Sequence, residues 1–433
     1  MDTIPKDTKE NGETDAVPPP AVPGEAVGPA APRPIGGQTF RTLRIKNFRL
    51  LFSGTIISQT GDFLQLTAQG WLVLVLTGSP LSLGIVGFAQ AVPRLALAPL
   101  MGKLADRFDR RKLLLIAQGG FLLQTLVFAT LVATKAITFA QIVVLTVIWG
   151  VLNGINHTAR QSLIPNIVPK KDITSAIALH SAAFNLTRAI GPAVGGTLVA
   201  WLGVAGCLWI NAVSFAPMFW MLLAMDVPRT ERKRGDGDQR FRQAIRFVWS
   251  EPDVRQAVGL TFAVAFFALG YARLAPAFAR DIFGGGPGTF GLLMAAPGIG
   301  ALASTLTLAR FGNARAVPRI LPLVTLGLAL ALGGFAASPT LGIAILFLVL
   351  LGALHLAQRT LASSLVQTRT PDALRGRVTS LFQIDVGLWS LGTLGMGGLA
   401  EAAGLRTAVG IGAMLCGAVA LAALFRALGR VRK

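Results

Sequence analysis

Charged residues are scarce in this sequence, and their scarcity excludes most soluble folds. Only 14% of the 433 residues are Asp, Glu, Lys or Arg, whereas 53% are hydrophobic. A soluble domain devotes about 25% of its residues to charge. A hydrocarbon core about 30 Å thick needs roughly 20 apolar residues per helix, so this chain has room for about a dozen spans. Its apolar runs are long and continuous, which predicts membrane helices and not the alternating strands of a barrel.

The residue types that build chemical sites are also few. There are 2 Cys and 3 His, and the cysteines Cys207 and Cys416 lie in separate apolar runs. This spacing gives neither a disulfide framework nor a metal site. The sequence has no Gly-rich phosphate loop followed by Lys, and no Ser-His-Asp or metal-hydrolase constellation. We therefore expect no enzymatic activity, no cofactor and no metal.

The N-terminal stretch has no apolar run, so it predicts no secretory signal. It carries three consecutive prolines at 18–20 among mixed charges, a composition that cannot build a core. We expect residues 1–45 to form a disordered tail. A regulatory or docking role for this tail is the alternative.

Twelve apolar runs follow the tail, each long enough to cross a membrane as a helix. The first six are Phe48–Leu76, Ser82–Leu104, Leu113–Ala133, Phe139–Leu163, Ile173–Leu202 and Ala205–Met225. The second six are Val258–Phe283, Phe290–Ala309, Val317–Ala337, Leu341–Val366, Val378–Gly404 and Thr407–Leu428. The sequence thus predicts an all-α integral membrane protein with 12 transmembrane helices.

The distribution of Lys and Arg predicts the orientation of these helices. Of the 40 basic residues, 32 fall in the tail, the ends and alternate loops, 3 fall in the other loops, and 5 fall inside spans. Basic loops stay in the cytoplasm, so both termini are expected there. The net charge of +20 could suggest nucleic-acid binding, but charges spread over separate loops do not form one binding face. No nucleic-acid partner is expected.

A charged segment divides the runs into two sets of six. Within it, Phe241, Ile245, Val248 and Trp249 share one face of a predicted helix flanked by arginines, a pattern typical of a helix on the membrane surface. The predicted organisation is a tail, a six-helix bundle, a cytoplasmic linker, a second bundle and a basic end. These parts are 1–45, 46–228, 229–257, 258–428 and 429–433.

The two sets of helices also look like a duplication. An offset of 202 residues places Pro169 on Pro371 and Gly195-Gly196 on Gly397-Gly398. Further matches occur at the same offset over about fifty residues, which supports two pseudo-symmetric halves.

The loop after the second helix carries the most specific motif. From Gly102 to Lys112 it combines a Gly, an Asp-Arg pair and a basic cluster. This resembles the signature of the major facilitator superfamily, although the family usually has a second Gly where Asp109 stands. The resemblance implies a latch that shuts the cytoplasmic side against the start of the eleventh helix. Its residues are Gly102, Asp106, Arg107, Arg110, Arg111, Arg375 and Arg377. The alternative is that the basic residues only anchor the loop.

The fifth helix contains the string Gly191-Pro192-Ala193-Val194-Gly195-Gly196. It resembles an element associated with exporters of the superfamily. Pro192 removes one backbone hydrogen bond, and Gly191, Gly195 and Gly196 permit close helix packing. Packing without any directional meaning is the alternative.

Charges at mid-membrane are costly, by about 2.5 to 3.5 kcal/mol each on insertion scales, so they usually face a cavity or a partner. The acids Asp62 and Asp385 and the arginines Arg94 and Arg188 fall at this depth. We hypothesise that Asp62 or Asp385 titrates during transport and that one of them pairs with Arg94 or Arg188. The alternative is a permanent ion pair. The Arg that many proton-coupled relatives carry on the fourth helix is absent, because Gly150 and Gly154 stand there.

The spans hold more arginines than acids, since Arg160, Arg273 and Arg359 also lie inside them. This excess favours anionic or acidic substrates over cations. In the superfamily the first, fourth, seventh and tenth helices line the cavity. This placement implies polar substrate contacts from Gln65, Gln69, Asn153, Asn156, Arg273 and Gln358.

The resemblance covers Phe48 to Leu428, and the opening Ser58-Gln59-Thr60-Gly61-Asp62 is similar to the subgroup that includes the bacterial enterobactin exporter. It implies a proton-coupled exporter of a small amphipathic molecule, such as a siderophore, drug or metabolite, in the bacterial inner membrane. The expected partners are this substrate, protons and lipids, with the chain acting as a monomer. An importer on the same fold and a non-transporting scaffold or sensor are the alternatives.

Overall fold

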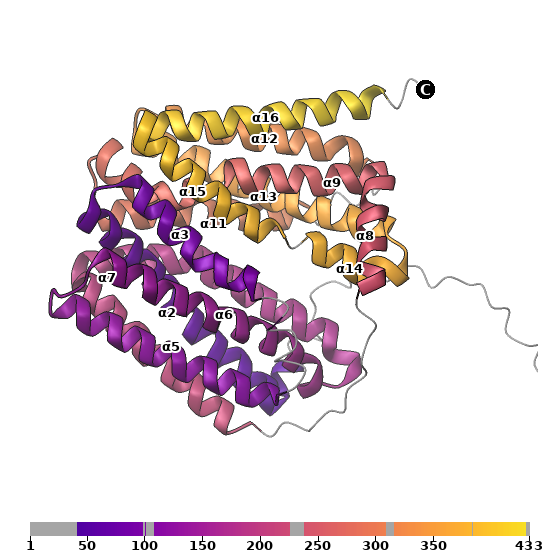
Figure 1. The fold of residues 1–433 in the computed structure, drawn as a ribbon. Coiled ribbons are helices and arrows are strands. Elements are labelled where there is room, and N and C mark those ends of the chain that lie inside the picture. The colour runs from indigo at the N-terminus through magenta and orange to yellow at the C-terminus, as the bar shows by residue number, and fades with distance from the viewer. Residues whose placement is uncertain are drawn as a thin grey trace, which may run out of the picture.

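A computed structural model describes residues 41–97, 100, 108–225, 238–308, 316–382 and 384–429, and all of its regular structure is helical in these ranges. The helices form two bundles that lie side by side (Figure 1). The first bundle contains η1 (Thr42–Arg44), α2 (Lys46–Thr77), α3 (Pro80–Ala96), α5 (Arg110–Ala133), α6 (Phe139–Ile167), η2 (Lys170–Asp172) and α7 (Ile173–Leu223). We call it the N-bundle.

The second bundle, which we call the C-bundle, is connected to the first through α8 (Asp238–Ser250). It contains α9 (Pro252–Ala263), η3 (Val264–Ala268), α10 (Tyr271–Ala277), η4 (Phe278–Ile282), α11 (Pro287–Leu308), α12 (Val317–Ala337), α13 (Leu341–Arg369), α14 (Asp372–Phe382), α15 (Asp385–Ala403) and α16 (Leu405–Gly429).

The expected twelve spans are recognisable in this order of elements. Helix α7 holds two of them, because Gly203 adopts φ 70° inside it and turns the chain back. A side chain at positive φ would be strained, so Gly is suited to this turn. Seven helices of the described chain are by themselves long and apolar enough to cross a membrane. The predicted all-α membrane fold with two six-helix bundles is confirmed.

Two predicted spans are less regular than expected. The seventh is built from α9, η3, α10 and η4, of which η3 and η4 are π-helices. The eleventh is divided between α14, which ends at Phe382, and α15, which begins at Asp385. Interruptions of this kind are found where a helix carries a functional group or must bend.

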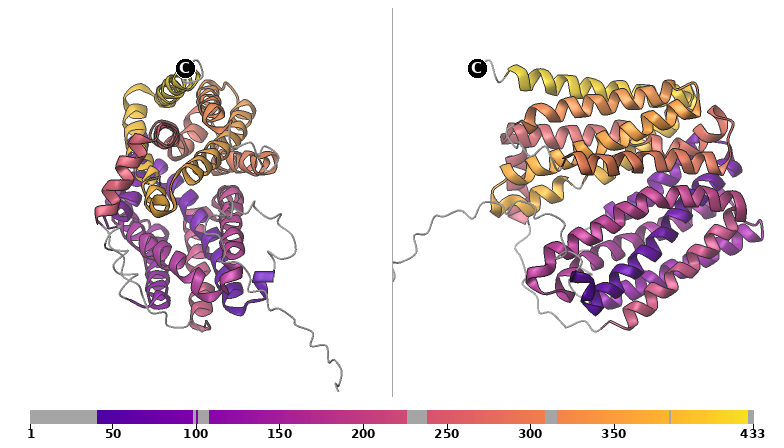
Figure 2. Two further views of the ribbon diagram at one scale, coloured as in Figure 1. Left: turned by 90° about the vertical axis from the view of Figure 1, so that its right-hand side faces the viewer. Right: turned by 180° about the vertical axis from the view of Figure 1, so that it is seen from behind.

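The two ends of the molecule differ in charge. We call the end where α5 begins and α16 ends the basic end, because Arg110, Arg111 and Arg426 lie there, and the opposite end the far end. Helices α8 and α14 also lie at the basic end (Figure 1). Figures 1 and 2 show the bundles close together at the far end and diverging toward the basic end.

The linker helix α8 packs against the C-bundle with one of its faces. Ala244 and Val248 are buried in a cluster with residues of α9 and α14, whereas Ile245 and Trp249 are exposed. The buried face of α8 is therefore turned against the C-bundle. Of the residues predicted for the membrane surface, Val248 belongs to this buried face, whereas Ile245 and Trp249 do not.

Candidate functional site

The first candidate group surrounds Asp62, which lies midway along α2. Its Oδ1 is buried without a hydrogen-bond partner. Arg160 of α6 acts on the Asp62 carboxylate electrostatically, and Trp149 is within hydrogen-bonding reach of it. No direct ion pair joins the two described residues Asp62 and Arg160. The carboxylate is thus held near a positive charge without being fully neutralised by it.

Arg160 is itself fixed inside the N-bundle. It is 5% exposed, and its Nη2 donates to Oδ1 of Asn156 over 3.1 Å. Gln118 of α5 donates to the same oxygen over 3.4 Å. Because these polar contacts anchor the guanidinium, Arg160 supplies a fixed positive charge beside Asp62.

The second candidate group surrounds Asp385, at the first residue of α15. Asp385 is 4% exposed and forms an ion pair with Arg359 of α13. The Arg359 guanidinium also lies 5.8 Å from the centre of the Phe382 ring. The positive dipole end of α15 adds to the stabilisation of the carboxylate. Its other oxygen, Oδ1, is buried without a hydrogen-bond partner, so the ion pair with Arg359 is the contact that compensates its charge.

These contacts correct the predicted pairing. Asp62 interacts with Arg160, and Asp385 with Arg359, so neither acid pairs with Arg188. The Arg94 side chain lies outside the part of the chain that the structure describes. Arg188 is exposed, and its electrostatic neighbours are Tyr271 and Arg359 of the C-bundle.

Several residues predicted to line the cavity are instead buried within one bundle. Gln65, 3% exposed, accepts hydrogen bonds from Asn211 and Thr125 over 2.8 and 3.1 Å. Gln69 donates to Thr146 of α6 over 2.6 Å. These amides hold the helices of the N-bundle together.

Gln358 has a similar structural role in the C-bundle, where it donates to Thr261 over 3.0 Å. Asn156 is engaged by Arg160 and Gln118. By contrast, Asn153 is half-buried, and Arg273 of α10 donates across the bundles to Gln90 of α3. Arg273 therefore lies where the two bundles meet.

The predicted latch can be followed only in part. Gly102, Asp106 and Arg107 lie outside the described residues. Arg111 donates to the carbonyls of Leu222 and Leu223 over 2.7 and 2.6 Å, which joins α5 to α7. These contacts stay within the N-bundle, so the latch remains a prediction.

On the other side of that predicted latch, Arg375 pairs with Asp372 at 2.5 Å inside α14 and donates to the Gln367 carbonyl over 3.2 Å. Arg377, on the same helix, also interacts with another residue. Both arginines predicted to flank the latch therefore already have partners in this structure.

The Gly-Pro string of α7 lies where the bundles touch. A Cβ on Gly196 would come 2.5 Å from the Cα of Gly291 and 2.6 Å from the Pro287 carbonyl, both at α11. Gly195 and Gly191 instead face Thr67 and Phe63 of α2. The string therefore packs against its own bundle and against the other one at the same time.

A matching contact joins α3 and α15. A Cβ on Gly397 would come 3.0 Å from the Pro80 carbonyl and 3.1 Å from the Cα of Gly84. Gly397 corresponds to Gly195 at the 202-residue offset, so the two bundle contacts are built from equivalent segments. Small residues allow backbones to approach this closely.

Polar contacts reinforce the far end. Glu401 of α15 accepts from Ser79 Oγ over 2.8 Å and from the Leu81 N–H over 3.3 Å, which caps the start of α3. Arg280 of η4 donates to the Leu74 carbonyl of α2 over 3.1 Å. The bundles are thus held together at the far end by backbone contact and by hydrogen bonds.

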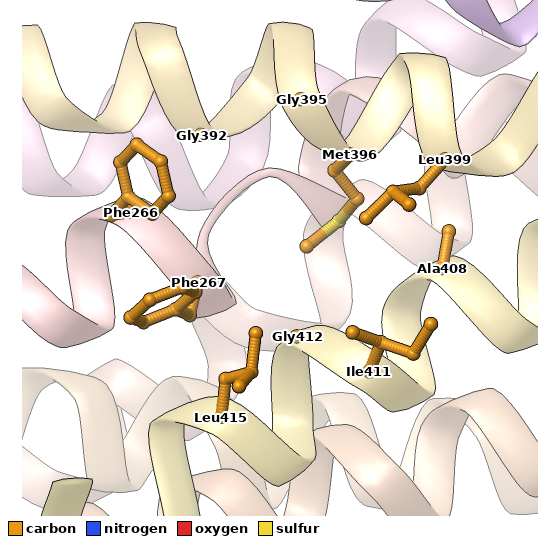
Figure 3. Close-up of a pocket in the computed structure, with 10 residues that line it drawn as sticks. All are labelled: Phe266, Phe267, Gly392, Gly395, Met396, Leu399, Ala408, Ile411, Gly412 and Leu415. Atoms are coloured by element: carbon orange, nitrogen blue, oxygen red, sulfur yellow. The ribbon is translucent and has the colours of Figure 1, made fainter.

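An apolar pocket of about 170 Å³ lies elsewhere, inside the C-bundle. Figure 3 shows Phe266 and Phe267 of η3 facing Met396 of α15 and Leu415 of α16. Its labelled side chains carry only carbon and sulfur atoms. A pocket that lacks polar groups and belongs to one bundle does not fit a path between two bundles, so we do not assign transport to it.

The chain is similar to known transporters over most of its length. A family model described as a transmembrane secretion effector matches residues 37–433. The staphyloferrin A transporter of Staphylococcus aureus is 25% identical, covering 82% of this chain and 90% of that protein. The multidrug efflux pump Tap of Mycolicibacterium fortuitum is 27% identical, with 86% and 94% covered. The enterobactin exporter of Shigella boydii is 26% identical, with 83% and 85% covered.

A solved structure supports the same fold. The structure of a bacterial homologue of the iron transporter ferroportin, in an inward-facing state, matches with a TM-score of 0.68 and 16% identity. It covers 88% of this chain and 99% of that one. At this identity the likeness concerns the fold alone.

Proposed function

We propose an export function for this chain, which belongs to the transmembrane secretion effector family of the major facilitator superfamily. The family and its relatives are transporters, so the chain is a membrane transporter and not an enzyme. The finer proposal is proton-driven export of a small amphipathic organic molecule by alternating access. It is supported by the names of the relatives, which include an efflux pump and an exporter.

The orientation forms part of this proposal. The basic end faces the cytoplasm, because loops rich in Lys and Arg stay on that side. The bundles diverge toward the basic end (Figure 2), and this divergence supports the proposal that the substrate path opens on the cytoplasmic side. A substrate would then enter from the cytoplasm. The proposed location is the inner membrane of a bacterial cell, and the chain is proposed to act there as a monomer.

Asp62 is the proposed proton carrier. Like Asp385 it has an unpartnered buried oxygen, but its positive neighbour, Arg160, does not form an ion pair with it. A carboxylate in this setting can gain or lose a proton without breaking a direct salt bridge. Asp385, held by Arg359, is assigned a structural role in the C-bundle.

Alternating access requires the far end to open. The contacts there are short backbone approaches at Gly196 and Gly397 and a few hydrogen bonds. Helices that touch through glycines can separate and come together again, because no side chains interdigitate at the contact. The Gly-Pro string is therefore proposed as part of the seam that closes the far end, and the Asp106 loop as part of the opposite closure.

The observation that carries the proposal is the arrangement of two bundles joined at one end, with an unneutralised acid at mid-depth. We would prepare everted vesicles from cells that express the protein. An extract of the host's own metabolites would be added to the outside of these vesicles. Mass spectrometry would then identify compounds that accumulate inside the vesicles when a proton gradient is imposed. Export predicts accumulation that stops when the gradient is collapsed.

The same assay separates the rival functions. An importer would deplete preloaded vesicles instead of filling them, and a scaffold or sensor would move no compound in either direction. Vesicles from cells that carry the Asp62→Asn variant provide the matched control, since they contain the same fold without the proposed proton carrier.

A further inference from the structure

Arg188 is a charged residue between the bundles for which the described part of the chain offers no counter-charge. It lies midway along the first span of α7 and is exposed. Among the described residues it has no hydrogen-bond partner and no carboxylate partner. An unpaired arginine at mid-membrane is costly unless it faces water or a ligand. Its guanidinium is therefore available to a molecule that enters between the bundles.

The groups opposite Arg188 belong to the C-bundle and are neutral or positive. Arg188 interacts electrostatically with Tyr271 of α10 and with Arg359 of α13. His355, one helical turn before Arg359, is influenced by both arginines. The Arg359 side chain is 36% exposed although it pairs with Asp385, so the ion pair does not enclose it.

Aromatic rings stand beside these charges. Phe184 lies one helical turn from Arg188 on α7 and is 41% exposed. Its ring centre is 6.4 Å from that of Phe63 on α2. On the opposite bundle, Phe382 lies under the Arg359 guanidinium. The charged cluster therefore has an exposed aromatic side chain beside it on the N-bundle and a buried ring in contact with Arg359 on the C-bundle.

The two buried acids have arginine neighbours of their own. Asp385 is paired with Arg359, and Asp62 lies under the influence of Arg160. Neither carboxylate is a partner of Arg188, so a cationic ligand at Arg188 would meet a positive charge without a counter-charge. An anion, by contrast, would relieve the repulsion between Arg188 and Arg359.

We propose that Arg188 and Arg359 form a binding site for an organic anion, with a carboxylate-like head between the two guanidinium groups and an aromatic or otherwise apolar body against Phe184 and Phe63. Tyr271 offers a hydroxyl next to the head group. The site spans both bundles, so an occupant would contact both during the cycle. This inference rests on the proposed function only in treating the site as part of a transport path.

The test uses three ligands of the same size, namely 2-naphthoate, 2-naphthamide and protonated 2-naphthylmethylamine. Their binding to the purified full-length protein would be measured by calorimetry in a chloride-poor buffer. Charge-assisted hydrogen bonds from an arginine should make 2-naphthoate bind about tenfold or more tightly than the amide, and the cation should bind weakest.

Variants show whether Arg188 is responsible for the preference. Arg188→Gln should bring 2-naphthoate to within about twofold of the amide, while Arg188→Lys should keep a preference for the anion. Arg246→Gln, at an exposed position on α8, removes the same charge from the linker and should change nothing. Replacing Arg188 breaks no hydrogen bond or ion pair among the described residues, so the variant is expected to fold.

The inference is overturned if 2-naphthoate binds no better than the amide, if it does not bind, or if Arg188→Gln leaves its affinity unchanged. Failure of the proposed function would look different. In that case anion binding would depend on Arg188, but everted vesicles would accumulate no compound. Conversely, vesicles that export only neutral or cationic compounds, equally well with Arg188→Gln, would keep the export function and remove the anion site.

Discussion

The two bundles each bury one carboxylate, and they hold it in opposite ways. Asp385 of the C-bundle forms a direct ion pair with Arg359 at the start of a helix. Asp62 of the N-bundle has an arginine nearby, Arg160, but no direct ion pair. Each of the two carboxylates has one buried oxygen without a hydrogen-bond partner, so the direct ion pair is what distinguishes them. A neutralised acid stabilises a fold, whereas an incompletely neutralised one can exchange a proton. The comparison assigns structure to one acid and coupling to the other.

The largest expected effect separates the two acids by transport. Asp62→Asn should reduce flux driven by a proton gradient to the background of empty vesicles, because the amide cannot carry the proton. Exchange of labelled for unlabelled substrate, which needs no net proton movement, should survive. Everted vesicles loaded with a transported metabolite provide both measurements. Full gradient-driven flux in this variant would remove the assignment.

The next effect concerns the two glycine contacts between the bundles at the far end, at Gly196 and at Gly397. The backbones approach more closely at Gly196 than at Gly397. Gly196→Ala would push a methyl group against the backbone of α11 at 2.5 Å, whereas Gly397→Ala would meet α3 at 3.0 Å. Overpacking of this kind costs about 1–3 kcal/mol. Spin-label distances across the far end should therefore lengthen in Gly196→Ala and change much less in Gly397→Ala. Equal distances in the two variants would mean that the seams do not differ.

The free energy of unfolding should respond to the two acids in the opposite order, with the larger effect at Asp385 and the smaller at Asp62. Asp385→Asn removes the partner of Arg359 and should lower the free energy of unfolding by about 1–3 kcal/mol, less than for a fully buried pair because Arg359 is partly exposed. Asp62→Asn should cost little. Thermal unfolding in micelles would measure both. The double variant Asp385→Asn with Arg359→Gln should recover part of the loss, and no recovery would argue against a pairwise contact.

The smallest effect lies at the exposed cap between the bundles. Glu401→Gln should keep an acceptor for Ser79 and Leu81 while losing the charge that favours the helix N-terminus. We expect a change below about 1 kcal/mol in the closure of the far end. Accessibility of a cysteine placed at the exposed Leu76, which leaves the Ser79–Glu401 hydrogen bond in place, would report it. A large change would mean that this cap, and not the glycine seams, holds the bundles together.

The sequence predicted the fold well because hydrophobic length and basic loops are governed by the membrane itself. The run at 317–337 matches α12 from end to end. The break before Asp385 was missed, since the apolar run continues through it. The Gly-Pro string was recognised, but its contact with Gly291 depends on the packing of two bundles that no local pattern encodes.

The ion-pair partners were missed for a geometric reason. Side chains on a helix lean toward its N-terminus. Helices α6 and α13 begin at the far end, so Arg160 and Arg359 lean back toward mid-membrane. Asp62 and Asp385 lie on helices that begin at the basic end and lean toward them. Depth counted along the backbone placed these arginines too far from the acids, and the long arginine side chain closes the difference.

The central claim is that the space between the two bundles opens alternately at the basic end and at the far end, and that the protonation of Asp62 controls this change. Spin labels at Gln161 and Gln367 would report the basic end, and labels at Thr134 and Thr340 the far end, all at exposed positions. Between mildly acidic and mildly alkaline buffer, one distance should shorten while the other lengthens, and Asp62→Asn should abolish that response. Distances that stay fixed, change in the same direction, or respond equally in Asp62→Asn would contradict the account.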